Sequence, residues 1–127
     1  MIYGAMLAGG SGTRVKSSKI PKQFIEIGGK PIIIYTLENM LKVKRFDYIY
    51  IAVHKDYEDY MNEQVKKNIP ESEKVRVILG GKERMDTINN VTTAITNDNG
   101  LHDDDVIVIH DAVRPFVCLL YTSDAAD

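Results

Sequence analysis

The chain has 127 residues, which is enough for a single domain around one hydrophobic core. Its apolar fraction of 44% and its charged fraction of 27% are typical of a soluble globular protein. Because 16 basic residues face 18 acidic ones, for a net charge of -2, no overall field attracts nucleic acid or an anionic membrane, and any anion site has to be local.

The first part of the chain predicts two strands with a helix between them. The apolar run "IYGAMLA" (2–8) ends in glycines and is typical of a buried parallel strand. Pro31 suits the first turn of a helix, and apolar residues recur after it at helical spacing. These apolar residues are Ile33, Leu37, Met40 and Leu41. The run "YIYIAV" (48–53) predicts the second strand.

The next part predicts two more helices and two more strands. Asp56 is a candidate cap for a helix that ends before Pro70. The run "VRVIL" (75–79) predicts the third strand and "DVIVIH" (105–110) the fourth. Apolar residues of the two helices are Tyr57, Tyr60, Met61 and Val65 in the first, and Ile88, Val91 and Ile95 in the second. The second helix runs out near "NDNG" (97–100).

This alternation of strands and helices predicts an α/β fold, with a mainly parallel sheet and helices on both of its faces. In such sheets ligands bind beyond the carboxyl ends of the strands. The segments that follow three of the predicted strands are also the richest in charged residues and glycines: "AGGSGTR" (8–14), "GGKER" (80–84) and "HDAVRP" (110–115). We therefore expect a functional site where these three segments meet.

The first of these segments has the composition of a polyphosphate-binding loop. Gly9, Gly10 and Gly12 allow a tight turn that brings backbone N–H groups close to a ligand. Arg14 and Lys22 add positive charge, and Lys16 and Lys19 are further candidates. A solvated basic turn would have the same local pattern, so the loop alone leaves both interpretations open.

Two well-known nucleotide motifs do not fit this loop. Its spacing is not that of the P-loop, which places a lysine directly after its last glycine. A dinucleotide fingerprint requires glycine where Val15 stands and an acidic residue where His54 follows the second strand. A dinucleotide-binding oxidoreductase is therefore disfavoured.

Three blocks of the sequence resemble the cytidylyltransferases that act on polyol phosphates. The blocks are "LAGG-x-G-x-R…PKQF" (7–24), "GGKERMDTI" (80–88) and "HDAVRPF" (110–116), in that order and each after a predicted strand. The resemblance covers about residues 1–117 and implies a Rossmann-like nucleotidyltransferase fold. It also implies a reaction in which CTP and a polyol phosphate give a CDP-polyol and pyrophosphate.

The resemblance implies a role for individual residues of these blocks. Arg14 and Lys22 would be catalytic, neutralising charge on the phosphates and on the leaving pyrophosphate. Asp111 would bind Mg2+, a hard cation that prefers carboxylate and phosphate oxygens. The nucleotide-binding set would be Leu7, Ala8, Gly9, Gly10, Gly12, Thr13, Arg14, Lys22, Gly81, Lys82, Thr87 and Asp111.

Two positions of the second block leave alternatives open. Lys82 and Thr87 stand where the methylerythritol enzymes commonly have an acid and a serine. Backbone contacts to cytosine survive both differences, but the methyl group of Thr87 restricts the rotamer of its hydroxyl. Arg84 is either a site residue or simply the start of the third helix. The acidic run Asp103, Asp104 and Asp105 predicts a solvated turn before the fourth strand rather than a metal site.

The resemblance includes enzymes with different acceptors. "LAGGSGTR", "IPKQF" and "VRPF" favour ribitol 5-phosphate, and 2-C-methyl-D-erythritol 4-phosphate is the alternative. A non-catalytic nucleotide-binding module is the alternative from another class, but such a module would not need Arg14, Lys22 and Asp111 together. No signal peptide or membrane-spanning run is predicted, and the only cysteine is Cys118, so we expect a cytoplasmic protein without disulfides.

The last ten residues, "CLLYTSDAAD" (118–127), differ from what precedes them. They resemble the translation of an adapter used in preparing DNA sequencing libraries, so we expect residues 1–117 to be the N-terminal part of a nucleotidyltransferase domain and residues 118–127 to be a non-native tail. The resemblance further implies a longer enzyme, with acceptor residues, a second metal-binding acid and an arm that forms a homodimer. We accordingly expect the 127-residue fragment to have little transferase activity.

Overall fold

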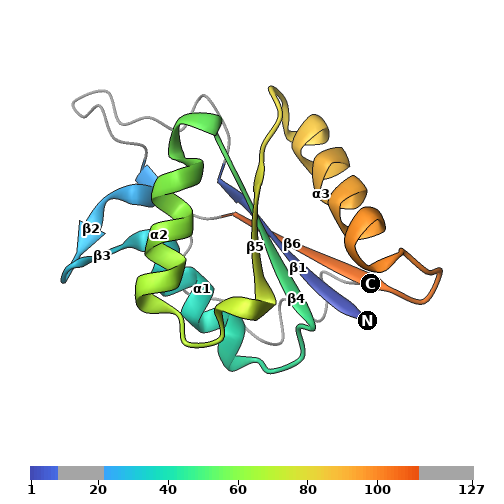
Figure 1. The fold of residues 1–127 in the computed structure, drawn as a ribbon, viewed down its shortest axis with the longest axis horizontal. Helices are drawn as coiled ribbons and strands as arrows, with labels where there is room; N and C mark the ends of the chain where they lie inside the picture. The colour runs from blue at the N-terminus through green and yellow to red at the C-terminus, as the bar shows by residue number, and fades with distance from the viewer. Residues whose placement is uncertain (9–21, 112–127) are drawn as a thin grey trace.

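The computed structural model describes residues 1–8 and 22–111, with the side chain of Asp111 left out (Figure 1). Its centre is a four-stranded sheet with the order β5-β4-β1-β6. The strands are β1 (Ile2–Ala8), β4 (Tyr48–Val53), β5 (Val75–Leu79) and β6 (Val106–Asp111). All three pairings are parallel, as the alternation of strands and helices predicts.

Helices cover both faces of this sheet (Figure 1). The first two, α1 (Ile32–Lys42) and α2 (Glu58–Asn68), lie on one face, and α3 (Arg84–Asn99) lies on the other. The predicted α/β architecture is therefore confirmed. Among the described residues, no helix has both the length and the apolar character required to span a bilayer.

The strands contribute to two separate cores because their side chains alternate between the faces. On the α1 and α2 face, Met6, Ile49 and Ile51 pack with the buried residues of those helices. On the α3 face, Tyr3 and Tyr50 pack with apolar residues of α3. The apolar residues of the first strands are thus divided between two layers, which explains why "IYGAMLA" and "YIYIAV" are nearly continuous apolar runs.

The direction in which successive strands are added to the sheet reverses at β1. From β1 the chain passes through α1 to β4 and through α2 to β5, and then α3 returns it to β6 on the other side of β1. The carboxyl ends of β1 and β6 therefore lie at the point where the strand order switches. In open α/β sheets this point is the usual place for a ligand.

Smaller elements lie between the main ones. A 3-10 turn η1 (Lys22–Phe24) precedes a hairpin of β2 (Glu26–Ile27) and β3 (Lys30–Pro31), and η3 (Ser72–Lys74) precedes β5. The hairpin was not among the predicted elements. Its two-residue connection, Gly28 and Gly29, has φ values of 62° and 87°, which are the positive values that a tight hairpin turn requires.

The predicted cap at Asp56 is wrong. A 3-10 turn η2 (Lys55–Tyr57) comes first, and α2 begins only at Glu58. Nδ1 of His54 accepts a hydrogen bond from the backbone N–H of Asp56 at 3.1 Å, so His54 caps the turn. Asp56 lies inside the first turn, where its carboxylate is still favourable near the positive end of the helical segment.

Candidate active site

The three charged segments start from strand ends that lie at the same carboxyl edge of the sheet. Val53, the last residue of β4, is the Cα partner of Ala8 at the end of β1. The backbone N–H of Gly80 donates to the carbonyl oxygen of Val53 at 2.8 Å, so the loop after β5 joins the same edge. On the other side of β1, Asp111 pairs with Leu7. The strand ends from which the three segments start therefore lie at one edge of the sheet, while most of the first and third segments lies outside the described residues.

The predicted residues of the glycine loop divide into two groups. Leu7 and Ala8 are the last two residues of β1, and Ala8 is buried. The remaining loop predictions lie outside the described residues: Gly9, Gly10, Gly12, Thr13 and Arg14.

Lys22 starts the turn η1 and is exposed, as a residue that contacts a soluble anion must be. The next residue, Gln23, is buried, and its Nε2 donates to the carbonyl oxygen of Ala8 at 2.7 Å. Sequence reasoning did not assign Gln23 any role. Its one signal in the sequence was its place within the "PKQF" block, between Lys22 and Phe24.

The block "GGKERMDT" (80–87) consists of a loop, residues 80–83, and the first residues of α3. The hydroxyl of Thr87 accepts a hydrogen bond from the backbone N–H of Gly81 at 2.9 Å and donates to the carbonyl oxygen of Glu83 at 3.2 Å. Only 4% of Thr87 is exposed. The hydroxyl therefore shapes the loop from inside, and its hydrogen is already engaged within the chain.

Gly81 has to be a glycine because of the helix behind it. A Cβ at this position would overlap the Cβ of Asp86 and lie 2.9 Å from the carbonyl carbon of Asp86. Asp86 is itself fixed, since its carboxylate accepts from the backbone N–H of Glu83 at 3.1 Å in a capping box. The backbone of Gly81 thus lies directly against the first turn of α3.

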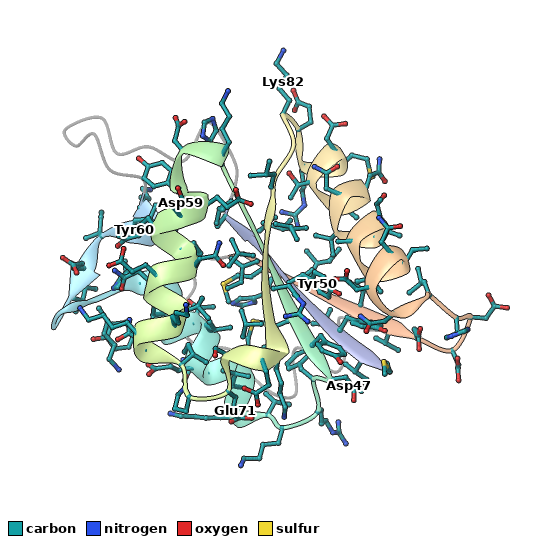
Figure 2. All side chains as sticks on the ribbon, in the orientation of Figure 1. Asp47, Tyr50, Asp59, Tyr60, Glu71 and Lys82 are labelled. Carbon is teal, nitrogen blue, oxygen red and sulfur yellow. The ribbon has the colours of Figure 1, made fainter. Side chains whose placement is uncertain are left out.

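Lys82 lies at the tip of this loop. Figure 2 shows its side chain extending away from the sheet at the top of the view. Lys82 and Arg84, the first residue of α3, are both exposed, so neither packs into the core. Lys82 is therefore accessible to a ligand beyond the edge of the sheet.

Among residues 1–8 and 22–110, whose side chains the structure describes, no group of three or more histidine, cysteine or acidic side chains is arranged to bind a metal ion. Asp103 and Asp104 lie in a turn, as predicted. Asp105 accepts from the α-amino group of Met1 and from the backbone N–H of His102, both at 2.8 Å, which is a structural role.

Comparison with known proteins supplies a family for this arrangement. The chain matches the family "IspD: 2-C-methyl-D-erythritol 4-phosphate cytidylyltransferase" over residues 2–125. The match includes all three blocks that carry the resemblance and extends past Val117. The acceptor named in this family is the alternative from the sequence, and nothing in the comparisons supports the preference for ribitol 5-phosphate.

Solved structures have the same fold. A 4-diphosphocytidyl-2C-methyl-D-erythritol synthase from Anaerococcus prevotii is 27% identical with a TM-score of 0.67, and the match covers 91% of this chain and 44% of that one. The 2-C-methyl-D-erythritol 4-phosphate cytidylyltransferase of Francisella tularensis is also 27% identical, with a TM-score of 0.68 and coverage of 97% and 49%. The bifunctional IspDF of Campylobacter jejuni, at 22% identity, has a TM-score of 0.72 with coverage of 96% and 28%.

The similarity to the bifunctional IspDF, at only 22% identity, bears on the fold alone. In all three cases the chain spans about half the length of the matched protein or less.

Proposed function

The chain belongs to the 2-C-methyl-D-erythritol 4-phosphate cytidylyltransferase family, and on that premise we propose that it supplies the nucleotide-binding part of an enzyme that transfers a cytidylyl group from CTP to 2-C-methyl-D-erythritol 4-phosphate. The observation that supports this proposal most is the gathering of Ala8, the Gly80–Lys82 loop and the end of β6 at one edge of the sheet. A switch point of this kind is where an α/β sheet binds its ligand.

The proposed reaction is an in-line displacement at phosphorus. A phosphate oxygen of the acceptor forms a bond to the α-phosphorus of CTP, while the bond from that phosphorus to the bridging oxygen breaks and pyrophosphate leaves. Negative charge on the phosphate oxygens has to be neutralised, and no covalent protein intermediate is required. The exposed ammonium of Lys22 suits this task, and Arg14 is the second candidate.

Recognition of the base would depend on backbone groups. Because the N–H of Gly81 already donates to Thr87, Gly81 would contribute its carbonyl oxygen to a ligand instead. The 4-amino group of cytosine is a donor that a carbonyl oxygen accepts, whereas uracil has an acceptor at the same position. Leu7, Ala8 and Lys82 are the other described residues of the proposed nucleotide site. Thr87 would support the loop through its hydrogen bond to Gly81.

Magnesium is the proposed cofactor. Asp111 ends β6 opposite Leu7, at the edge where the phosphates would lie, and a carboxylate beside phosphate oxygens is a suitable ligand set for this cation. When bound, the ion would neutralise charge on the phosphates. Asp111 is the residue of this chain that would bind it. We also propose that the complete enzyme is a homodimer, as the resemblance implies.

The nucleotide is tested by isothermal titration calorimetry of the chain with CTP, UTP, GTP and ATP, each with Mg2+. We expect CTP to bind most tightly and Lys22→Ala to weaken its binding. Lys67→Ala is the matched control, because Lys67 is an exposed lysine in the last turn of α2, away from the carboxyl edge. Tighter binding of UTP or GTP would reject the proposed base specificity.

The reaction is tested by pyrophosphate release from the complete protein that carries this chain, with 2-C-methyl-D-erythritol 4-phosphate and with ribitol 5-phosphate as acceptors. We expect faster release with the first, and a loss of about a hundredfold in turnover in Lys22→Ala, as for an aligned charge that stabilises a transition state. Faster release with ribitol 5-phosphate would reject the proposed acceptor. Binding of CTP without any release would indicate a non-catalytic nucleotide-binding module.

A further inference from the structure

The three described residues of the "PKQF" block have very different environments. Lys22 is exposed, whereas Gln23 and Phe24, which follow it in η1, are only 2% and 3% exposed. The backbone N–H of Ile25 donates to the carbonyl oxygen of Lys22 at 3.2 Å and closes the turn. The exposed ammonium group is therefore carried by a short turn whose next two side chains point into the protein.

Gln23 joins this turn to the central strand of the sheet. Its Nε2 donates to the carbonyl oxygen of Ala8 at 2.7 Å, across 15 positions in the sequence. Ala8 is the last residue of β1 and pairs with the last residue of β4, so it cannot move without disturbing both strands. The hydrogen bond fixes the distance between η1 and the carboxyl edge.

Phe24 fixes the other side of the same turn. Its ring stacks on that of Tyr57 with centroids 4.6 Å apart, and it meets the edge of Tyr60 at 5.3 Å. Both tyrosines come from the start of α2 and the turn before it. One polar and one aromatic contact, made to different elements, set the orientation of η1 as well as its position.

Gln23 places a polar side chain at a buried position. Its Oε1 is buried, and it has no hydrogen-bond partner in the part of the chain that the structure describes. An unpaired buried oxygen is destabilising, and an apolar side chain of the same length would avoid it. The contribution that offsets this cost is the Nε2–H group, which only an amide supplies to Ala8 here.

We propose that Gln23 is a positioning residue for Lys22: its amide fixes η1 against the end of β1 and so places the Lys22 ammonium where the phosphates of the nucleotide would lie. This inference rests on the function proposed above. Gln23 touches no substrate in this role, and its effect on the reaction passes entirely through Lys22.

A double-mutant cycle in the complete protein that carries this chain tests the proposal. Gln23→Met keeps the length of the side chain and removes both polar atoms, so we expect its melting temperature to stay within about 5 °C of the wild type. We expect its kcat to fall by about tenfold to a hundredfold, with a smaller change in the KM for CTP, because a misplaced charge is lost mainly in the transition state. In the Lys22→Ala background the same substitution should change kcat by less than about twofold.

The matched control is Gln64→Met on α2. Gln64 is partly exposed and accepts a hydrogen bond from Asn68 within the same helix, so this variant makes the same chemical change away from η1 and should keep wild-type kcat. If Lys22→Ala itself leaves kcat unchanged, the function proposed above is overturned and this inference with it. Wild-type kcat in Gln23→Met beside an impaired Lys22→Ala overturns this inference alone, as does an equal loss from Gln23→Met in both backgrounds.

Discussion

Thr87 shows how one buried hydroxyl can serve a binding loop without touching the ligand. It accepts from the N–H of Gly81 and donates to the carbonyl oxygen of Glu83, so it joins the loop after β5 to the first turn of α3. The family resemblance placed Thr87 among the nucleotide-binding residues and left open whether its hydroxyl contacts the base. The structure surrounds the hydroxyl with its own chain, which makes a supporting role the simpler hypothesis.

Thr87→Val tests that role. Valine has nearly the same shape but leaves the N–H of Gly81 without its partner, so we expect the free energy of unfolding to fall by about 1–3 kcal/mol. CTP binding by the chain should weaken as the loop loosens. Thr87→Ser retains the hydroxyl and should keep both properties close to wild type. Denaturant unfolding and calorimetric titration measure the two effects.

Thr92→Val is the control for this substitution. Thr92 lies in the same helix, and its hydroxyl only donates to the carbonyl oxygen of Ile88 at 3.0 Å, so no backbone N–H loses a partner when it is replaced. We expect Thr92→Val to keep wild-type CTP affinity. Equal losses of affinity in both valine variants would contradict a specific role for Thr87.

At the scale of elements, α3 depends on polar contacts to remain on the sheet. Only three of its residues are buried: Thr87, Val91 and Ile95.

Tyr50 of β4 lies between the sheet and α3 (Figure 2). Its hydroxyl donates to the carboxylate of Asp98 at 2.9 Å and accepts from Asn99 at 3.1 Å, near the end of the helix. Burial, and then the hydrogen bond to Asp98, raise the pKa of Tyr50, so the phenol stays protonated even above its ordinary pKa of 10.0.

Tyr50→Phe should therefore loosen the last turns of α3 while the aromatic ring stays in the core. We expect the free energy of unfolding to fall by about 1–2 kcal/mol, since one of the two lost bonds is to a charged group. Tyr48→Phe, which keeps a ring stacked on Tyr3 at 6.4 Å, is the control and should be close to wild type. Denaturant titration followed by circular dichroism measures both variants, and an unchanged midpoint in Tyr50→Phe would be the opposite result.

At the scale of the whole molecule, the amino edge of the sheet is fastened by an ion pair. Asp105 lies directly before β6, and Met1 lies directly before β1. The carboxylate of Asp105 accepts from the α-amino group of Met1 at 2.8 Å. The hydrogen bond from this amino group, and then the one from the backbone of His102, lower the pKa of Asp105. The contact joins the two strands between which the strand order reverses, at the end opposite the candidate site.

Because the pKa of Asp105 is lowered in the folded state, its stabilising contribution is present above its ordinary pKa of 3.8 and is lost as the pH falls through the lowered value. Asp105→Asn should thus reduce the melting temperature at pH 6–7, a range chosen to keep the carboxylate ionised, and the difference from wild type should shrink toward zero in acid. Asp103→Asn, an exposed position of the same turn, is the control. Thermal melts across pH 2.5–7 measure the effect; a difference that does not depend on pH would contradict it.

Much of the fold follows from local patterns. The predicted strands 2–8, 48–53 and 75–79 have the bounds of β1, β4 and β5, because each is a short run of mainly apolar residues that contains β-branched or aromatic side chains. The hairpin of β2 and β3 was missed, since both residues of β2 are exposed and two residues show no periodicity. Its usable signal was the Gly28-Gly29 pair. The predicted cap at Asp56 failed because a 3-10 turn capped by His54 precedes α2: Nδ1 of His54 accepts from the backbone N–H of Asp56, which places Asp56 inside that turn.

By itself, the sequence determined the α/β class, the three charged segments and the family resemblance, because these depend on residue types at short spacing. Only the tertiary structure decided the strand order β5-β4-β1-β6 and, with it, which strand ends lie together. It also decided that Gln23 bonds to Ala8 and that the Thr87 hydroxyl, in the first turns of α3, bonds to Gly81 of the preceding loop. Contacts of this kind do not follow the regular spacing of a helix or a strand, so no local sequence pattern predicts them. They form only when the packed elements bring the two atoms within hydrogen-bond distance.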